Sequence, residues 1–178
     1  MKILRKIVAI GLIWVFWVNP IYPQTIKKES IRRLKKDCIN ATIRAIKLEI
    51  ERHQKWLQIP KEDLTAGAEP REKIAERLKK LKDDLLKYKN MKIEDYKLPQ
   101  KKEVIGWTHH TCKEGTLLRI KNMTRSGPFY HIVGIKGGNY DVIKPRVKYK
   151  MTIYLLYPRN YPFFNYYIFI ENYEKISN

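Results

Sequence analysis

Apolar residues recur at helical spacing between residues 26 and 59 and fall into two stripes. The first stripe runs through Leu34, Ala41 and Leu48. The second stripe consists of Ile39, Ile43, Ile46, Ile50 and Leu57. Because successive helical residues turn by about 100°, the two stripes lie roughly 130° apart. The pattern therefore predicts one long helix that is covered on two sides.

A second helix is predicted after the segment 59–70, which holds two prolines and a glycine and is typical of a loop. Pro70 suits the first turn of the new helix. The apolar residues of this helix follow the 4-3-4-3 spacing of a coiled-coil seam: Ile74, Leu78, Leu81, Leu85 and Tyr88. We expect the seam to pack on the first stripe, so that residues 25–97 form a coiled-coil-like helical hairpin.

Beyond Pro99 the apolar pattern changes to alternation, which is typical of strands. The predicted strands are 103–108, 116–122, 129–135, 140–144, 147–156 and 163–171. Short strands about ten residues apart indicate a small antiparallel β-sandwich or barrel. The run 139–145, followed by a long alternating strand, resembles immunoglobulin-like modules in architecture. We therefore predict an α+β protein whose residues 98–178 form an immunoglobulin-like β-sandwich.

The last predicted strand is apolar on both faces, so both faces need a cover. One possible cover is the second helical stripe of the same chain. The other is a neighbouring subunit, because Tyr and Phe are enriched at subunit interfaces. The candidate interface residues are Ile39, Ile43, Ile46, Ile50, Leu57, Phe163, Tyr167 and Phe169.

Residues 1–24 have the layout of an export signal, with basic residues ahead of an unbroken apolar run from Ile7 to Val18. This run is shorter than the roughly 20 residues that a membrane-spanning helix needs. No pair of small residues marks a cleavage site, so an uncleaved membrane anchor is the alternative. In either case we expect an exported protein that is periplasmic, at the cell surface or extracellular.

Basic residues outnumber acidic ones by 37 to 18, which gives a formal net charge of +19. A chain of this charge attracts polyanions. Side chains two apart on a strand share a face, so basic residues at this spacing form rows. The predicted rows are Lys144, Arg146, Lys148 and Lys150, and also Arg119 and Lys121. These rows are a candidate anion-binding site, and the alternative is a solvated edge on which lysines prevent aggregation.

The stretch 108–115, THHTCKEG, places two histidines and a thiol close together. In a strand, His109 and His110 point to opposite faces, and the chain lacks the second half of a zinc motif, so we predict no metal site. The chain has two cysteines, Cys38 and Cys112. In an oxidising compartment they are a candidate disulfide between helix and sheet. Two separate buried thiols are the alternative.

The sequence contains no phosphate-binding loop, dinucleotide fingerprint or nucleophile elbow. We therefore expect a protein that is not an enzyme and uses no cofactor. The first hypothesis is an envelope or extracellular structural protein that assembles with itself or with another envelope protein. The alternative is a binding module for an anionic polymer, glycan or lipid head group. Nucleic acid is not an expected physiological partner of an exported chain.

Overall fold

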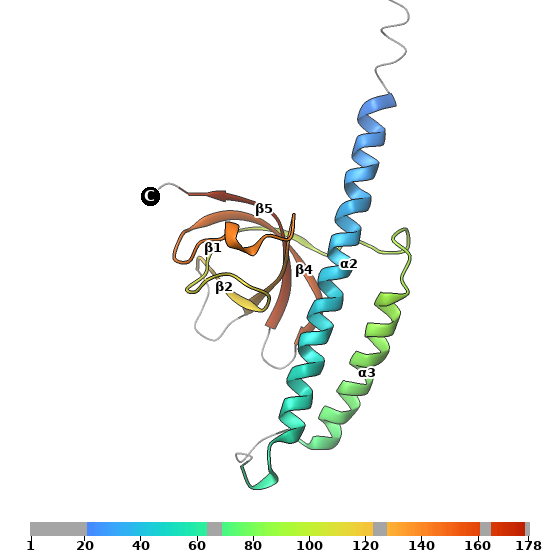
Figure 1. The fold of residues 1–178 in the computed structure, drawn as a ribbon, viewed down its shortest axis with the longest axis vertical. Coiled ribbons are helices and arrows are strands. Elements are labelled where there is room, and N and C mark those ends of the chain that lie inside the picture. The colour runs from blue at the N-terminus through green and yellow to red at the C-terminus, as the bar shows by residue number, and fades with distance from the viewer. Residues whose placement is uncertain (1–20, 64–68, 123–127, 161–164, 177–178) are drawn as a thin grey trace, which may run out of the picture.

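Two helices pack beside a closed barrel of five strands in the computed structural model (Figure 1). The structure describes residues 21–63, 69–122, 128–160 and 165–176. The longer helix lies between the barrel and the shorter helix, so it contacts both.

The helices are α2 (Ile21–Gln58) and α3 (Arg71–Lys89), and a 3-10 turn, η1 (Lys61–Asp63), follows α2. Both lie where the apolar periodicity predicts a helix. Pro70 directly precedes α3, which is a position where its missing N–H costs no helical hydrogen bond.

The barrel strands are β1 (Lys101–Trp107), β2 (Thr116–Ile120), β3 (Phe129–Ile135), β4 (Tyr149–Asn160) and β5 (Asn165–Lys175). Their order is β1-β2-β3-β5-β4, and the pairing of β4 with β1 closes the barrel. Neighbouring strands are antiparallel except for β3 and β5, which are parallel.

The predicted immunoglobulin-like β-sandwich is therefore wrong, because the strands form one closed sheet instead of two stacked sheets. Residues 140–144, predicted as a strand, contain the 3-10 turn η2 (Tyr140–Val142). Alternation of apolar residues shows which face of a strand is buried, and a barrel and a sandwich share that alternation. The alternation of apolar residues does not reveal that β5 lies between β3 and β4.

The interior of the barrel is filled by inward-facing apolar residues such as Leu118, Ile132, Met151 and Ile168. The connection from β3 to β4 packs on this core through Ile143, with Tyr140 and Val142 beside it. The hydroxyl of Tyr149 accepts a hydrogen bond from the backbone N–H of Lys144 and donates one to the carbonyl of Val142. These hydrogen bonds hold the connection against the first residue of β4.

The helix α2 packs on the outer face of β3, β5 and β4. Its contact residues include Cys38, Ala41 and Ala45, all of which are fully buried. These small side chains let the helix come close to the sheet. A Cβ atom on Gly134 of β3 would lie 3.1 Å from Cβ of Ala41 and 2.7 Å from the ring of Phe169.

The predicted coiled-coil-like hairpin is also wrong. The two helices do contact each other, but the stripe predicted to receive α3 lies in the cluster with barrel residues. The period of the apolar residues places them on a helix face without saying which neighbour covers that face. The smallest residues of α2 face the barrel because a curved sheet packed closely on a helix leaves little room for long side chains.

Residues 1–20, most of the predicted export signal or anchor, lie outside the described residues. Neither described helix combines the length and the apolar character that crossing a membrane requires. The first turns of α2 extend beyond the barrel (Figure 1), and every residue from 27 to 33 is exposed.

Replacing Gly134 by alanine should weaken the contact between α2 and the barrel. The added Cβ would overlap the ring of Phe169, and overpacking of this kind costs about 1–3 kcal/mol. Urea unfolding of the full chain measures the loss. In a Phe169→Leu background, where the ring is absent, the same alanine should cost less. An equal cost in both backgrounds would contradict the close approach.

Candidate functional site

The outer faces of β1 and β2 lie beyond the contact that α2 makes with β3, β5 and β4. On β1, Val104 packs against the barrel core, and a Cβ on Gly106 would meet Leu118 of the core. Because strand side chains alternate, Ile105 and Trp107 point outward. They give this face an apolar centre.

Basic residues surround that centre on both sides. Trp107 is directly opposite Arg119 on β2, and Ile105 is directly opposite Lys150 on β4. The backbone N–H of Lys121 donates to the carbonyl of Ile105 over 2.8 Å, which places Lys121 on the β2 side of Ile105. We call the resulting set the basic face: Ile105, Trp107, Arg119, Lys121, Lys148 and Lys150.

Lys148 joins this face because it continues the line of β4. Its carbonyl accepts a hydrogen bond from the backbone N–H of Ile176 over 3.0 Å, which extends the ladder between β4 and β5 by one step. Lys148 precedes Lys150 by two residues, so the two side chains share the outer face.

The basic face is accessible, since its three lysines are exposed and its other members are half-buried. Nε of Arg119 is buried and has no hydrogen-bond partner within the described ranges. Two acids border the face: Glu103 precedes Ile105 by two residues on β1, and Glu174 of β5 lies opposite Lys150. The four cations outnumber them.

The spacing of the cations suits a linear polyanion. Side chains on one face of a strand repeat about every 7 Å, and adjacent strands lie about 4.8 Å apart. The basic residues of β2 and those of β4 therefore form two columns, about 10 Å apart, on either side of β1. A polymer lying along β1 would have cations on both sides and Trp107 beneath it. An aromatic ring offers a stacking surface to sugars or bases.

The structure joins the two predicted basic rows across β1, but it interrupts one of them. The strand β4 begins at Tyr149, so Lys144 and Arg146 belong to the connection before it. Arg146 has a φ of +62°, in the left-handed region, and its backbone N–H donates to the carbonyl of Thr108 over 2.6 Å. Lys144 and Arg146 therefore do not share a strand face with Lys150.

Sequence reasoning missed Ile105 and Trp107. The alternation in the predicted strand 103–108 already places them on one face. Their importance depends on Arg119 and Lys150 being their cross-strand neighbours, and sequence spacing does not give strand pairing.

Most candidate interface residues are used within the chain. Four are buried: Ile39, Ile46, Tyr167 and Phe169. Three more are half-buried: Ile43, Ile50 and Leu57. Phe163 lies outside the described residues. The outer face of β5 is thus covered by α2 of the same chain, which is the intramolecular alternative for the last strand.

The segment 108–115 connects β1 to β2. His109 and His110 are exposed, whereas Cys112 is buried against the barrel core. Within the described part of the chain, no three or more His, Cys, Asp or Glu side chains form a group that could hold a metal ion.

The predicted Cys38–Cys112 disulfide is wrong, because both cysteines are free. Cys38 lies between α2 and the outer wall of the barrel, whereas Cys112 lies against the core inside it. Burial is the main cause that raises the pKa of each thiol, to about 12 for Cys38 and about 11 for Cys112. Both are therefore neutral and unreactive near pH 8.

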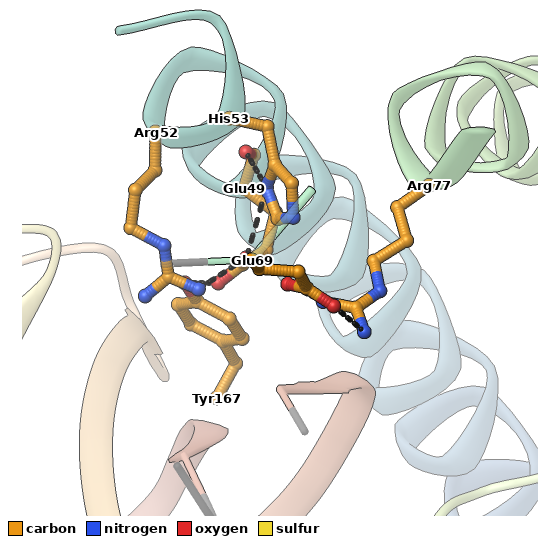
Figure 2. A network of polar contacts seen from close by, with 6 residues as sticks. All are labelled: Glu49, Arg52, His53, Glu69, Arg77 and Tyr167. Carbon is orange, nitrogen blue, oxygen red and sulfur yellow. Dashed lines mark hydrogen bonds and ion pairs between the residues drawn. The ribbon is translucent and has the colours of Figure 1, made fainter. Parts of the chain in front are cut away.

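A buried polar network fastens α2 to β5 (Figure 2). Glu49 of α2 is 1% exposed. It accepts a hydrogen bond from the hydroxyl of Tyr167 and forms an ion pair with Arg52. Nδ1 of His53 lies 2.8 Å from the carbonyl oxygen of Glu49, which requires that Nδ1 carries the proton and donates.

The network serves the helix–barrel contact. Burial, followed by the neighbouring Glu49 carboxylate, raises the pKa of Tyr167, so the hydroxyl stays protonated and donates. Figure 2 also shows the pair of Glu69 and Arg77, which is bidentate with N–O distances of 2.6 and 2.7 Å. This second pair is more exposed, so water screens it.

Comparisons with protein-family models, with curated proteins and with solved structures found no match to this chain. Function is therefore inferred from the site alone. The Glu49 network is buried in a packing contact, whereas the basic face is open to a ligand. The basic face is the candidate functional site.

Both thiols should resist a thiol reagent at pH 8 in the native protein and react fully after unfolding in denaturant without reductant. A fast native reaction would contradict their burial, and a missing thiol after unfolding would indicate a disulfide.

Because the folded pKa values of the two thiols exceed the ordinary value of 9.0, their contribution to stability is complete below pH 9. It should be lost as the pH rises through 11 to 12.

Glu49 and Tyr167 should be coupled in stability. Tyr167→Phe leaves a buried carboxylate with one donor fewer, and we expect a loss of about 1–3 kcal/mol. A double-mutant cycle with Glu49→Gln, followed by urea unfolding, measures the coupling free energy. Arg77→Ala, which breaks the more exposed pair, is the control and should cost less than about 1 kcal/mol. Additive effects of the two core changes would refute the coupling.

Proposed function

We propose that this chain binds a linear acidic polysaccharide along the basic face, and that it does so as a non-enzymatic module of an exported protein. The observation that supports this most strongly is the flanking of Trp107 and Ile105 by cations on both neighbouring strands. An apolar floor between two columns of positive charge suits a polymer of rings that carry anionic groups.

Each part of the basic face has a chemical role in this proposal. The Arg119 guanidinium can form paired hydrogen bonds with a carboxylate or sulfate, which a lysine ammonium cannot match in geometry. The lysines supply charge without fixing orientation. The ring of Trp107 stacks on the apolar face of a sugar. The net charge of +19 attracts the polymer from a distance.

An acidic glycan fits the proposed location better than nucleic acid does. Residues 1–24 carry the pattern of an export signal or anchor, so we propose that the barrel meets envelope or extracellular polymers. Five-stranded Greek-key barrels such as the OB-fold bind both oligosaccharides and oligonucleotides. That precedent concerns architecture alone. Nucleic acid is therefore the rival outcome of the binding test.

Assembly through the second stripe of α2, which consists of Ile39, Ile43, Ile46, Ile50 and Leu57, has less support. Ile39 and Ile46 are buried within the chain, so they offer no free surface to a partner.

Titration of the full chain with heparin, with polygalacturonate and with a single-stranded oligonucleotide tests the proposal. The titrations are made at about 0.05, 0.1 and 0.2 M salt, because the screening of charge changes strongly over this range. Replacing the four cations of the basic face together (Arg119→Gln, Lys121→Gln, Lys148→Gln, Lys150→Gln) should weaken glycan binding at least about tenfold. The dependence of affinity on salt should also become shallower, because fewer counterions are displaced.

The matched control removes four exposed lysines of α3: Lys73→Gln, Lys79→Gln, Lys80→Gln and Lys82→Gln. It lowers the net charge by the same amount and should change affinity less than about threefold, since it acts only through the long-range field. Equal losses in the two variants would mean that net charge, and not the basic face, binds the polymer. Tighter binding of the oligonucleotide than of both glycans would assign the face to nucleic acid.

A further inference from the structure

The end of β5 is a free strand edge. β3 pairs with β5 only as far as Ile170, whose carbonyl accepts a hydrogen bond from the backbone N–H of Lys136 over 2.9 Å. The chain then turns away at Gly137 and Gly138, which both have positive φ. β5 continues to Lys175 and is paired there with β4 alone. The closed barrel thus carries an open edge at one end.

A β-bulge marks the point where this edge begins. Thr152 of β4 pairs with Asn172 and Ile153 pairs with Ile170, so Glu171 is the extra residue on β5. A bulge bends its strand and re-aims the chain that follows. Figure 1 shows the end of β5 leading away from the barrel toward the C-terminus.

The backbone groups on the edge can be assigned from the ladder. Ile176 donates its N–H to Lys148 of β4, and in an antiparallel pair every second residue bonds to the same neighbour. The N–H and C=O groups of Tyr173 and Lys175 therefore point away from β4. Within the described chain, no other strand pairs with them. All four residues from 172 to 175 are exposed, Tyr173 by 39%.

We propose that this edge pairs antiparallel with the same edge of a second copy, forming a two-fold symmetric dimer. An unpaired edge is a template for another strand, and a two-fold contact requires a self-complementary segment. The segment NYE, 172–174, meets that requirement when the axis passes at Tyr173. The Tyr173 residues of the two protomers then exchange both backbone hydrogen bonds.

The charges select this register. With the axis at Tyr173, Asn172 of one protomer lies opposite Glu174 of the other, so no like charges face each other. Glu171 is the bulged residue, and its carboxylate forms an ion pair with Lys101 of the same chain, with an N–O distance of 3.3 Å. An axis at Glu174 would set two glutamates face to face, and an axis at Lys175 would do the same with two lysines. Like charges directly opposite on paired strands destabilise the pair.

The space beside the edge also suits a second strand. A cavity of about 520 Å³ opens where β3 leaves β5, and Lys136 and Glu171 line it together with Ile31 and Leu34 of α2. The incoming strand ends beside this cavity, whose lining side chains are mostly charged or polar.

Dimerisation and polymer binding should respond to salt in opposite ways. Each copy carries a net charge of +19, so repulsion opposes association and added salt screens it. Salt weakens the binding of a polyanion. The dimer does not depend on the proposed function, and the failure of one proposal leaves the other standing.

Light scattering of the full chain, in mild detergent and at 0.05 and 0.5 M salt, tests the dimer. The polypeptide mass should rise toward twice 21.4 kDa at the higher salt. Tyr173→Lys places two ammonium groups opposite each other across the axis and should return the mass to that of a monomer. Leu86→Lys, at a 62% exposed position on α3, makes the same change in charge away from the edge and should remain dimeric.

A second measurement avoids any effect of Tyr173→Lys on folding. Tyr173→Cys should give a covalent dimer with a short bis-maleimide, and Leu86→Cys should not, because position 86 lies away from the edge. The native thiols of Cys38 and Cys112 should not react, because they are buried and neutral. A parent monomer at both salt concentrations would overturn the proposal. So would a Tyr173→Lys variant that stays dimeric, or equal cross-linking at positions 173 and 86. A monomer that adds an acidic peptide to this edge would assign the edge to another partner.

Discussion

The close contact between α2 and the outer wall of the barrel determines which surfaces of this protein are open. Small residues make the approach possible, with Ala41 against Gly134, and the ring of Phe169 fills the remaining space. Because the helix covers β3, β5 and β4, the last strand finds its second cover inside the chain. The faces beyond the helix, on β1 and β2 and at the end of β5, are those left for ligands and partners.

A contact between small residues and a sheet has little to stop the helix from sliding along the strands. Two directional contacts between α2 and the sheet remove that freedom: the hydroxyl of Tyr167 donates to Glu49, and Nε of Arg44 donates to the carbonyl of Val133 on β3 over 2.7 Å. A buried charge is costly unless its partners are in place. Its role here is therefore to fix the position of the helix along β5, and the packing of small and aromatic residues supplies the stability.

The elements could be predicted from the sequence far better than their neighbours. The periodicity located α2 and α3, Pro70 marked the start of α3, and β3 has the bounds that alternation predicts. The partners depended on long-range pairing that spacing does not encode. Ala41 faces the barrel and not α3, and Cys38 and Cys112 lie on opposite sides of the barrel wall. Trp107 became informative only when its register with Arg119 was known.

The two proposals strengthen each other through charge. An antiparallel edge pair with its axis perpendicular to the sheet turns the same face of both protomers to one side, so one polymer chain can contact two basic faces. The second contact is then intramolecular and gains from a high effective concentration. A bound polyanion also neutralises the charge of +19 on each copy, which removes the repulsion that opposes pairing at β5. By linkage, a ligand that favours the dimer must bind the dimer more tightly than the monomer.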